Sequence, residues 1–195
     1  MEILPLNEYT YACLLREIRD RTGKNSPLFA AIDGRCGSGK STLGQRMADD
    51  LSGVLLHMDD FYLRKEQRTP ERYAEPGGNV DRERVAALLE TLKDGKGGYF
   101  RKTMHPNFDL GPENTVPASD IYIVEGSYSM HPELRRFYGI SVFLTLPENV
   151  QRERLMKRNP DQMDMFIGKW IPLEEKYFSG LHVIEHCDRI FDTSL

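Results

Sequence analysis

The chain has 195 residues, of which 29% are charged, and its formal net charge is −4. This length suits a single domain over 1–195 that buries its core without disulfides. A mildly acidic chain argues against nonspecific nucleic-acid binding, which needs a basic surface, and no apolar run approaches the roughly 20 residues that span a bilayer. We therefore expect neither a nucleic acid nor a membrane as a partner, and a homo-oligomer stays open.

Two features of the chain favour the cytoplasm. Residues 1–5 lack the basic and apolar regions of a signal peptide. The cysteines Cys13, Cys36 and Cys187 are odd in number and far apart, which suits a reducing compartment and indicates no structural zinc site. Cys36 is interpreted as a passive residue of its loop, with redox sensitivity as the alternative.

Apolar runs alternate with helical patterns along the chain. The first pattern predicts a helix over 7–21, with Tyr11, Leu14, Leu15 and Ile18 at helical spacing. Strands are predicted over 28–33, 54–58, 121–124, 140–144 and 189–191. Further helices are predicted over 40–51, 81–92, 132–137, 148–158 and 161–177. This alternation predicts an α/β fold with a parallel sheet that is covered on both faces.

Two long segments interrupt the alternation. The segment over about 63–80 is polar and contains Pro70, Pro76 and two adjacent glycines. The segment over about 97–117 is rich in turn residues and predicts a hairpin or a loop. Long irregular segments in compact domains are usually functional, so both are expected to lie at a binding site.

A phosphate-binding motif follows the strand over 28–33. It consists of glycine, four residues, glycine, lysine and serine. Its glycines let backbone N–H groups surround a polyphosphate, and the next helix adds the positive end of its dipole. Lys40 would bridge the outer phosphates, and the Ser41 hydroxyl would ligate magnesium. The expected nucleotide-binding residues are Gly34, Arg35, Cys36, Gly37, Ser38, Gly39, Lys40, Ser41 and Thr42. The alternative is a glycine turn that only connects a strand to a helix.

Acidic residues end the next two predicted strands. Asp59 follows the strand over 54–58, and Glu125 follows the strand over 121–124. Ligands of a parallel sheet gather at the carboxyl ends of its strands. Glu125 is placed to complete the magnesium site with Ser41, and Asp59 is a further candidate there. Asp59 is also placed to contact an acceptor hydroxyl as a general base or an orienting acceptor. Helix capping is the structural alternative for both carboxylates.

Arginines gather in the helix predicted over 148–158. Arg154 and Arg158 are spaced i,i+4, so they are predicted to share a face. Phosphoryl transfer needs cations over the transferring group, and a mobile lid over about 150–170 would supply them. Arg154 and Arg158 are therefore candidate catalytic residues together with Lys40 and Asp59. A solvated basic face is the alternative.

The run from His57 to Tyr62, HMDDFY, resembles the uridine kinase family of P-loop kinases when it is taken with the loop. The resemblance extends through the run from Ile123 to Tyr128, IVEGSY. It implies the three-layer P-loop NTPase fold with a parallel five-stranded sheet, a small β-hairpin extension and a helical lid that carries arginines. It also implies ATP and Mg²⁺ as cofactors, Asp59 as the base, and Glu125 near the metal.

The resemblance also implies an acceptor site. In nucleoside kinases of this family, residues that match Tyr62 and Asp81 line the sugar site, next to Asp59. Tyr99, Arg101 and His105 are the nearest candidates to hold the base, and His105 could instead be a turn residue before Pro106. The run AEPGGNVD that ends at Asp81 departs from the aromatic-Asp-His-Pro pattern of nucleoside enzymes.

Together these features predict an ATP-dependent kinase that transfers the γ-phosphoryl group to a hydroxyl of a small molecule. The 5′-hydroxyl of uridine or cytidine is the favoured acceptor, and a pantothenate-like or sugar-like alcohol is the alternative. A nucleotide-hydrolysing switch protein is a third interpretation, although the chain has no Asn-Lys-x-Asp motif and does have an acceptor-side segment.

Overall fold

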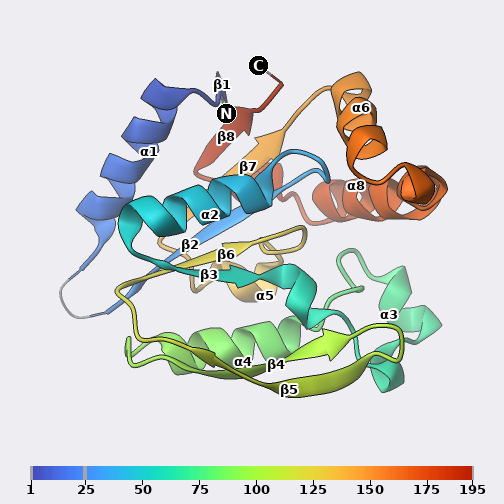
Figure 1. The fold of residues 1–195 in the computed structure, drawn as a ribbon, viewed down its shortest axis with the longest axis horizontal. Helices are drawn as coiled ribbons and strands as arrows, with labels where there is room; N and C mark the ends of the chain where they lie inside the picture. The colour runs from blue at the N-terminus through green and yellow to red at the C-terminus, as the bar shows by residue number, and fades with distance from the viewer. Residues whose placement is uncertain (1, 24–25, 195) are drawn as a thin grey trace.

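A parallel sheet forms the centre of the computed structural model, which describes residues 2–23 and 26–194 (Figure 1). Within these residues the sheet has six strands in the order β1-β8-β7-β2-β6-β3. Its strands are β1 (Ile3–Pro5), β2 (Leu28–Gly34), β3 (Val54–His57), β6 (Ile121–Glu125), β7 (Ile140–Thr145) and β8 (Arg189–Asp192). The register places Ile32 of β2 opposite Glu125 of β6, so the end of β6 lies beside the start of the phosphate-binding loop.

The sheet differs from the expected five strands by the addition of β1. This strand has three residues, pairs only with β8 at the sheet edge, and leaves Ile3 57% exposed. Pro5 ends the strand and has no N–H to donate to a neighbour. A short and half-exposed edge strand carries no run of buried residues, so its sequence pattern does not indicate it.

Helices cover both faces of the sheet, as predicted. On one face, α1 (Glu8–Arg21) and α2 (Lys40–Leu51) pack Leu14, Ile18 and Met47 against Ile32 and Ile123. On the other face lie α4 (Arg82–Leu92), α5 (Pro132–Arg135) and α8 (Ile171–Gly180). Successive strand residues alternate between the two cores because strand side chains point to opposite faces. The predicted three-layer α/β architecture is therefore confirmed.

The first long segment lies at the carboxyl end of the sheet. It begins after the 3₁₀ turn η1 (Met58–Phe61), contains η2 (Lys65–Gln67) and α3 (Pro70–Ala74), and closes with an isolated bridge between Tyr62 and Val80. The second segment forms an antiparallel hairpin of β4 (Gly98–Met104) and β5 (Asp109–Val116), apart from the main sheet (Figure 1). The predicted hairpin is thus present.

The lid segment follows β7. It runs through α6 (Glu148–Arg158), the 3₁₀ turn η3 (Pro160–Gln162), α7 (Met163–Met165), a π-helical turn η4 (Phe166–Trp170) and α8. The helix predicted over 161–177 therefore contains a π-helical turn and extends to Gly180. A last 3₁₀ turn, η5 (Ile184–His186), leads to β8. In the part of the chain that the structure describes, no helix is long and apolar enough to cross a bilayer.

Candidate active site

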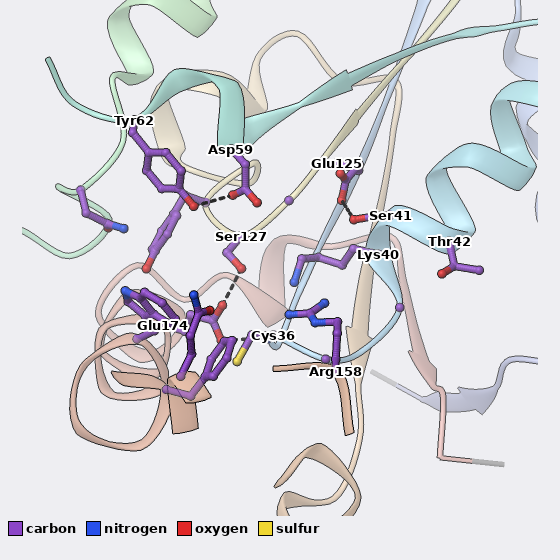
Figure 2. A pocket seen from close by; sticks show the side chains of 18 residues that line it. Cys36, Lys40, Ser41, Thr42, Asp59, Tyr62, Glu125, Ser127, Arg158 and Glu174 are labelled. Carbon is purple, nitrogen blue, oxygen red and sulfur yellow. Dashed lines mark hydrogen bonds between the residues drawn. The ribbon is translucent and has the colours of Figure 1, made fainter. Parts of the chain in front are cut away.

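A cleft of about 350 Å³ lies where the phosphate-binding loop, the ends of β3 and β6, and the lid segment meet (Figure 2). Its walls come from segments far apart in the sequence. The lining residues are Cys36, Gly37, Gly39, Lys40, Ser41, Thr42, Asp59, Tyr62, Asn79, Glu125, Gly126, Ser127, Tyr128, Arg158, Gln162, Phe166, Trp170 and Glu174. Six of the nine predicted nucleotide-binding residues and the two strand-end carboxylates therefore face one space, whereas Gly34, Arg35 and Ser38 do not line it.

The loop has a backbone that only glycine adopts readily. Gly34, Gly37 and Gly39 have φ values of 139°, 76° and 91°. A Cβ on Gly34 would collide with the backbone oxygen of Leu144 on the neighbouring strand β7. Gly39 is the N-cap of α2, so the unpaired N–H groups and the positive end of that helix face the cleft.

Lys40 lies across the loop that it follows. Its Nζ donates to the carbonyl oxygens of Gly34 at 2.7 Å and Arg35 at 3.0 Å. Lys40 lines the cleft, as does Arg158 (Figure 2). The loop thus combines backbone donors with an ammonium group, which is the chemistry that a polyphosphate requires.

Ser41 and Glu125 meet at the start of α2. The Ser41 hydroxyl donates to Oε2 of Glu125 at 3.2 Å, and Nδ1 of His57 lies 2.5 Å from Oε1 of the same carboxylate. This hydrogen bond to Glu125 raises the pKa of His57. A Cβ on Gly44 would lie 3.2 Å from Cγ of Glu125, so the absence of a side chain at Gly44 makes room for that carboxylate. A hydroxyl and a carboxylate side by side are hard oxygen donors that fit Mg²⁺.

Asp59 and Tyr62 form the opposite wall. Both belong to the turn that follows β3, and the Tyr62 hydroxyl donates to Oδ1 of Asp59 at 2.9 Å. Burial, together with the Asp59 charge, raises the pKa of Tyr62, so this phenol stays protonated and keeps donating. Asp60, which follows Asp59 in the chain, turns away from the cleft and pairs with Lys102 of the hairpin at 3.0 Å. Asp59 is therefore held with its carboxylate at the cleft.

Four of the predicted acceptor residues lie outside the cleft lining. Asp81 is fully buried, caps the N-terminus of α4, and lies 2.8 Å from Nε of Arg84, so its carboxylate is committed to the fold. Tyr99 is 65% exposed on the hairpin. Arg101 donates to the carbonyl of Gly111 across the same hairpin, and the His105 ring contacts the Tyr62 ring edge-on at 5.4 Å. His105 thus contacts the cleft residue Tyr62 without lining the cleft itself.

The two lid arginines do not point into one space. Arg158 lines the cleft. Arg154 instead donates to Oγ1 of Thr193 at 3.2 Å and to the carbonyl of Gly37 at 3.4 Å, and it lines a second cavity. Both arginines belong to α6, but contacts with Thr193 direct the Arg154 guanidinium away from the cleft that Arg158 lines.

Several cleft residues were not foreseen in a binding role. Ser127 and Tyr128 directly follow Glu125-Gly126, so the strand-end rule that selected Glu125 could have included them. No sequence pattern of this kind pointed to Glu174 on α8 as a binding residue. It is 5% exposed, and its carboxylate accepts hydrogen bonds from the Ser127 hydroxyl at 2.6 Å and the Cys36 N–H at 2.9 Å.

A buried aspartate connects the elements behind the cleft. Asp33 is the next-to-last residue of β2, which is buried throughout, and it accepts from the Gly34 N–H at 2.7 Å, the Met130 N–H at 2.8 Å and the Tyr177 hydroxyl at 2.7 Å. Its burial raises the pKa of this carboxyl. Asp33 thereby joins the loop, the turn after β6 and the helix α8, which carries both Tyr177 and Glu174.

Comparisons with known proteins add the following. No protein-family model matches the chain. Uridine-cytidine kinase D of Dictyostelium discoideum is 26% identical over 137 residues, which cover 70% of this chain and 27% of that protein. The chain thus spans about a quarter of the length of that relative. Uridine kinase of Clostridium perfringens is 26% identical over 148 residues, which cover 68% of each protein.

Two solved structures show the same fold. A possible uridine kinase from Bacillus stearothermophilus superposes with a TM-score of 0.66 at 22% identity and covers 93% of this chain and 97% of its own. D-glycerate 3-kinase from Cryptococcus neoformans var. grubii superposes with a TM-score of 0.60 at 15% identity and covers 88% and 87%. The chain therefore has the fold of the P-loop kinases, and its sequence resembles the uridine kinase family.

Proposed function

We propose that this chain is an ATP- and Mg²⁺-dependent kinase that transfers the γ-phosphoryl group to a hydroxyl of a small molecule. The observation that carries the proposal is the composition of the cleft. One wall holds the phosphate-binding loop with Lys40 and the Ser41–Glu125 pair, and the facing wall holds the carboxylate of Asp59. A nucleotide switch needs the first wall only, whereas a transferase needs both.

The donor would lie along the loop, with its phosphates at the backbone N–H groups and at Lys40. A second cavity of about 330 Å³ shares Gly39 and Thr42 with the cleft and lies beyond them, next to Arg46 and Leu43. An ATP molecule whose phosphates occupy the loop can place its base and ribose there, because this cavity offers apolar walls with polar groups between them.

Ser41 and Glu125 would hold the magnesium ion, which neutralises charge on the transferring phosphates. Asp59 would accept the hydrogen bond of the acceptor hydroxyl and orient or deprotonate it, while Tyr62 fixes the carboxylate by its own hydrogen bond. Arg158 would place a cation near the transferred group. Positioning and electrostatics would supply most of the rate, as in other phosphoryl transfers.

The charges of the cleft favour an uncharged acceptor. Among residues 2–23 and 26–194, the cations that line it are Lys40 and Arg158, which belong to the donor side. Several basic residues of the two acceptor segments are engaged elsewhere, since Arg64 pairs with Asp81, Arg72 with Glu83 and Lys102 with Asp60. A carboxylate-bearing or phosphorylated alcohol would therefore find no partner charge among the acceptor-side residues that line the cleft.

The aromatic lining favours a flat ring on the acceptor. Tyr62, Tyr128, Phe166 and Trp170 line the same cleft and can stack on a base or cover a sugar ring. Together with the relatives named uridine kinase, these walls support the 5′-hydroxyl of uridine or cytidine as the acceptor, in preference to pantothenate or a phosphorylated sugar.

A product assay tests the proposal. The protein is incubated with ATP and Mg²⁺ and with uridine, cytidine, ribose, pantothenate or glycerate, and ATP consumption and product mass are measured. We expect a phosphorylated nucleoside and no product with Lys40→Ala. Turnover of pantothenate or glycerate alone would refute the uncharged acceptor, and release of inorganic phosphate without any phosphorylated acceptor would refute the kinase.

A further inference from the structure

One helical run supplies the lid side of the cleft. Phe166, Trp170 and Glu174 all line the cleft and lie at intervals of four residues within the run from Met163 to Gly180. In a regular α-helix, four residues overshoot a full turn by about 40°, so Glu174 would be rotated by about 80° from Phe166. The π-helical turn Phe166–Trp170 takes more residues for its turn and offsets this rotation.

The sequence accounts for the position of that turn. Pro172 lies just beyond it. In a regular α-helix it would offer no N–H to the carbonyl of Gly168 four residues earlier, and its ring would crowd that carbonyl. A wider turn before the proline relieves both problems, and π-helical turns are frequent at functional sites. The turn therefore brings Glu174 to the face that Phe166 and Trp170 present to the cleft.

At that position Glu174 contacts the phosphate-binding loop. Its Oε2 accepts the N–H of Cys36 at 2.9 Å, and its Oε1 accepts the Ser127 hydroxyl at 2.6 Å (Figure 2). The next residue, Glu175, pairs with the guanidinium of Arg35 at 2.9 Å. Glu174 is 5% exposed, so a buried carboxylate occupies a backbone donor of a loop whose donors are arranged for anions.

We propose, on the basis of the proposed function, that Glu174 is a positioning residue that competes with the nucleotide phosphates for the loop. One N–H makes one good hydrogen bond, so a phosphate oxygen that reaches the Cys36 N–H takes the place of the Glu174 carboxylate. Like charges also oppose their joint presence. Glu174 thus ties the lid run to the loop, and the triphosphate releases it, which couples nucleotide binding to the position of Phe166 and Trp170.

The substitution Glu174→Gln tests this competition. A neutral amide is a weaker competitor than a carboxylate in either orientation, since charge-assisted hydrogen bonds are about twice as strong. We expect the Kd of Mg-ATP, measured by titration calorimetry without an acceptor, to fall by about tenfold, or about 1.4 kcal/mol. Inorganic tripolyphosphate should show the same gain, because the effect concerns phosphates and not the base.

A purely structural role of Glu174 predicts that the substitution raises the Kd of Mg-ATP. If Glu174 only supports the loop, Glu174→Gln loosens the loop and raises the Kd of Mg-ATP, and an unchanged or higher Kd overturns the proposal. Glu185→Gln is the matched control, because it removes the same charge from an exposed position in η5 that pairs with His182. It should leave the Kd of Mg-ATP as in the wild type.

Steady-state kinetics show whether Glu174 positions the site for catalysis or only blocks the binding of ATP. Glu174→Ala removes the acceptor of the Ser127 hydroxyl as well as the competing charge, so KM for ATP should fall while kcat falls by about tenfold. A fall in KM with a higher kcat would mean blockage alone and would contradict the positioning role. The binding measurements use no acceptor, so a tighter Kd in a protein that phosphorylates nothing would refute the kinase and leave the competition standing. Absence of ATP and tripolyphosphate binding in the wild type would overturn both.

Discussion

Substitution of Gly34 by alanine tests why the phosphate-binding loop begins with glycine. Gly34 has a φ of 139°, and it lies opposite Leu144 in the register between β2 and β7. A Cβ there would collide with the backbone oxygen of Leu144 and approach its nitrogen to 2.7 Å. Because the obstacle is the backbone of a central strand, no rotamer change relieves it. The two strands would have to separate.

The magnitude follows from two separate costs. A non-glycine residue at such a φ costs about 1–3 kcal/mol, and inserting a methyl group into a closely packed site costs about 1–3 kcal/mol more. We therefore expect Gly34→Ala to lower the free energy of unfolding by about 4 kcal/mol, which for a chain of this size lowers Tm by about 12 °C. Gly39→Ala has a φ of 91° but no atom within 4 Å of the new Cβ, so it should cost about 2 kcal/mol.

Thermal unfolding followed by circular dichroism, without nucleotide, measures both variants, because a bound ligand would add its own stabilisation. The prediction concerns the difference between them, which isolates the collision with β7 from the backbone strain that they share. If Gly34→Ala melts at the temperature of Gly39→Ala, the close approach of Gly34 to Leu144 is not a constraint and the reasoning is refuted.

Three further predictions concern the site and the pH dependence of stability. Lys40→Ala should lower kcat by about 10²-fold or more with little change in Tm, and near-normal turnover would contradict the loop assignment. Asp59→Asn should lower kcat by at least about 10²-fold with the Kd of Mg-ATP nearly unchanged, whereas Tyr62→Phe, which removes only the hydrogen bond to Asp59, should cost less; a lost Mg-ATP affinity in Asp59→Asn would instead indicate a metal ligand. Burial, with help from a neighbouring arginine, lowers the pKa of His131 to about 4. The folded protein therefore resists protonation that the unfolded chain accepts, and stability should fall as the pH drops from about 6.5 towards 4, by no more than about 3 kcal/mol. His131→Asn keeps a capping side chain and should flatten this dependence in urea titrations at several pH values.

Local patterns predicted most of the fold. The strands β2, β6 and β7 are buried along almost their whole length, so their apolar runs identify them, and Asn7 and Asp81 cap α1 and α4 as their sequence positions suggest. The strand β1 was not predicted because its stability comes from pairing with β8, which lies at the other end of the chain. The π-helical turn was not predicted because a helical pattern does not reveal how the backbone accommodates Pro172.

The donor half of the candidate site is the part that the amino-acid sequence determined by itself. The loop from Gly34 to Thr42 is continuous, and its conformation follows from its own glycines and from the helix that it begins. The chemistry of the backbone N–H groups, Lys40 and Ser41 can therefore be inferred without knowledge of the segments that pack against the loop.

The acceptor side and the lid side of the candidate site were decided by tertiary structure. Asp81 is held by Arg84, and Arg154 is held by the C-terminal segment. Glu174 contacts the loop at Cys36, which lies 138 positions away from it in the chain. The physical reason is that a charged side chain takes its direction and its partner from whatever packing places beside it. Spacing along the chain selects the residue types, and the packing of distant segments decides which of them face the cleft.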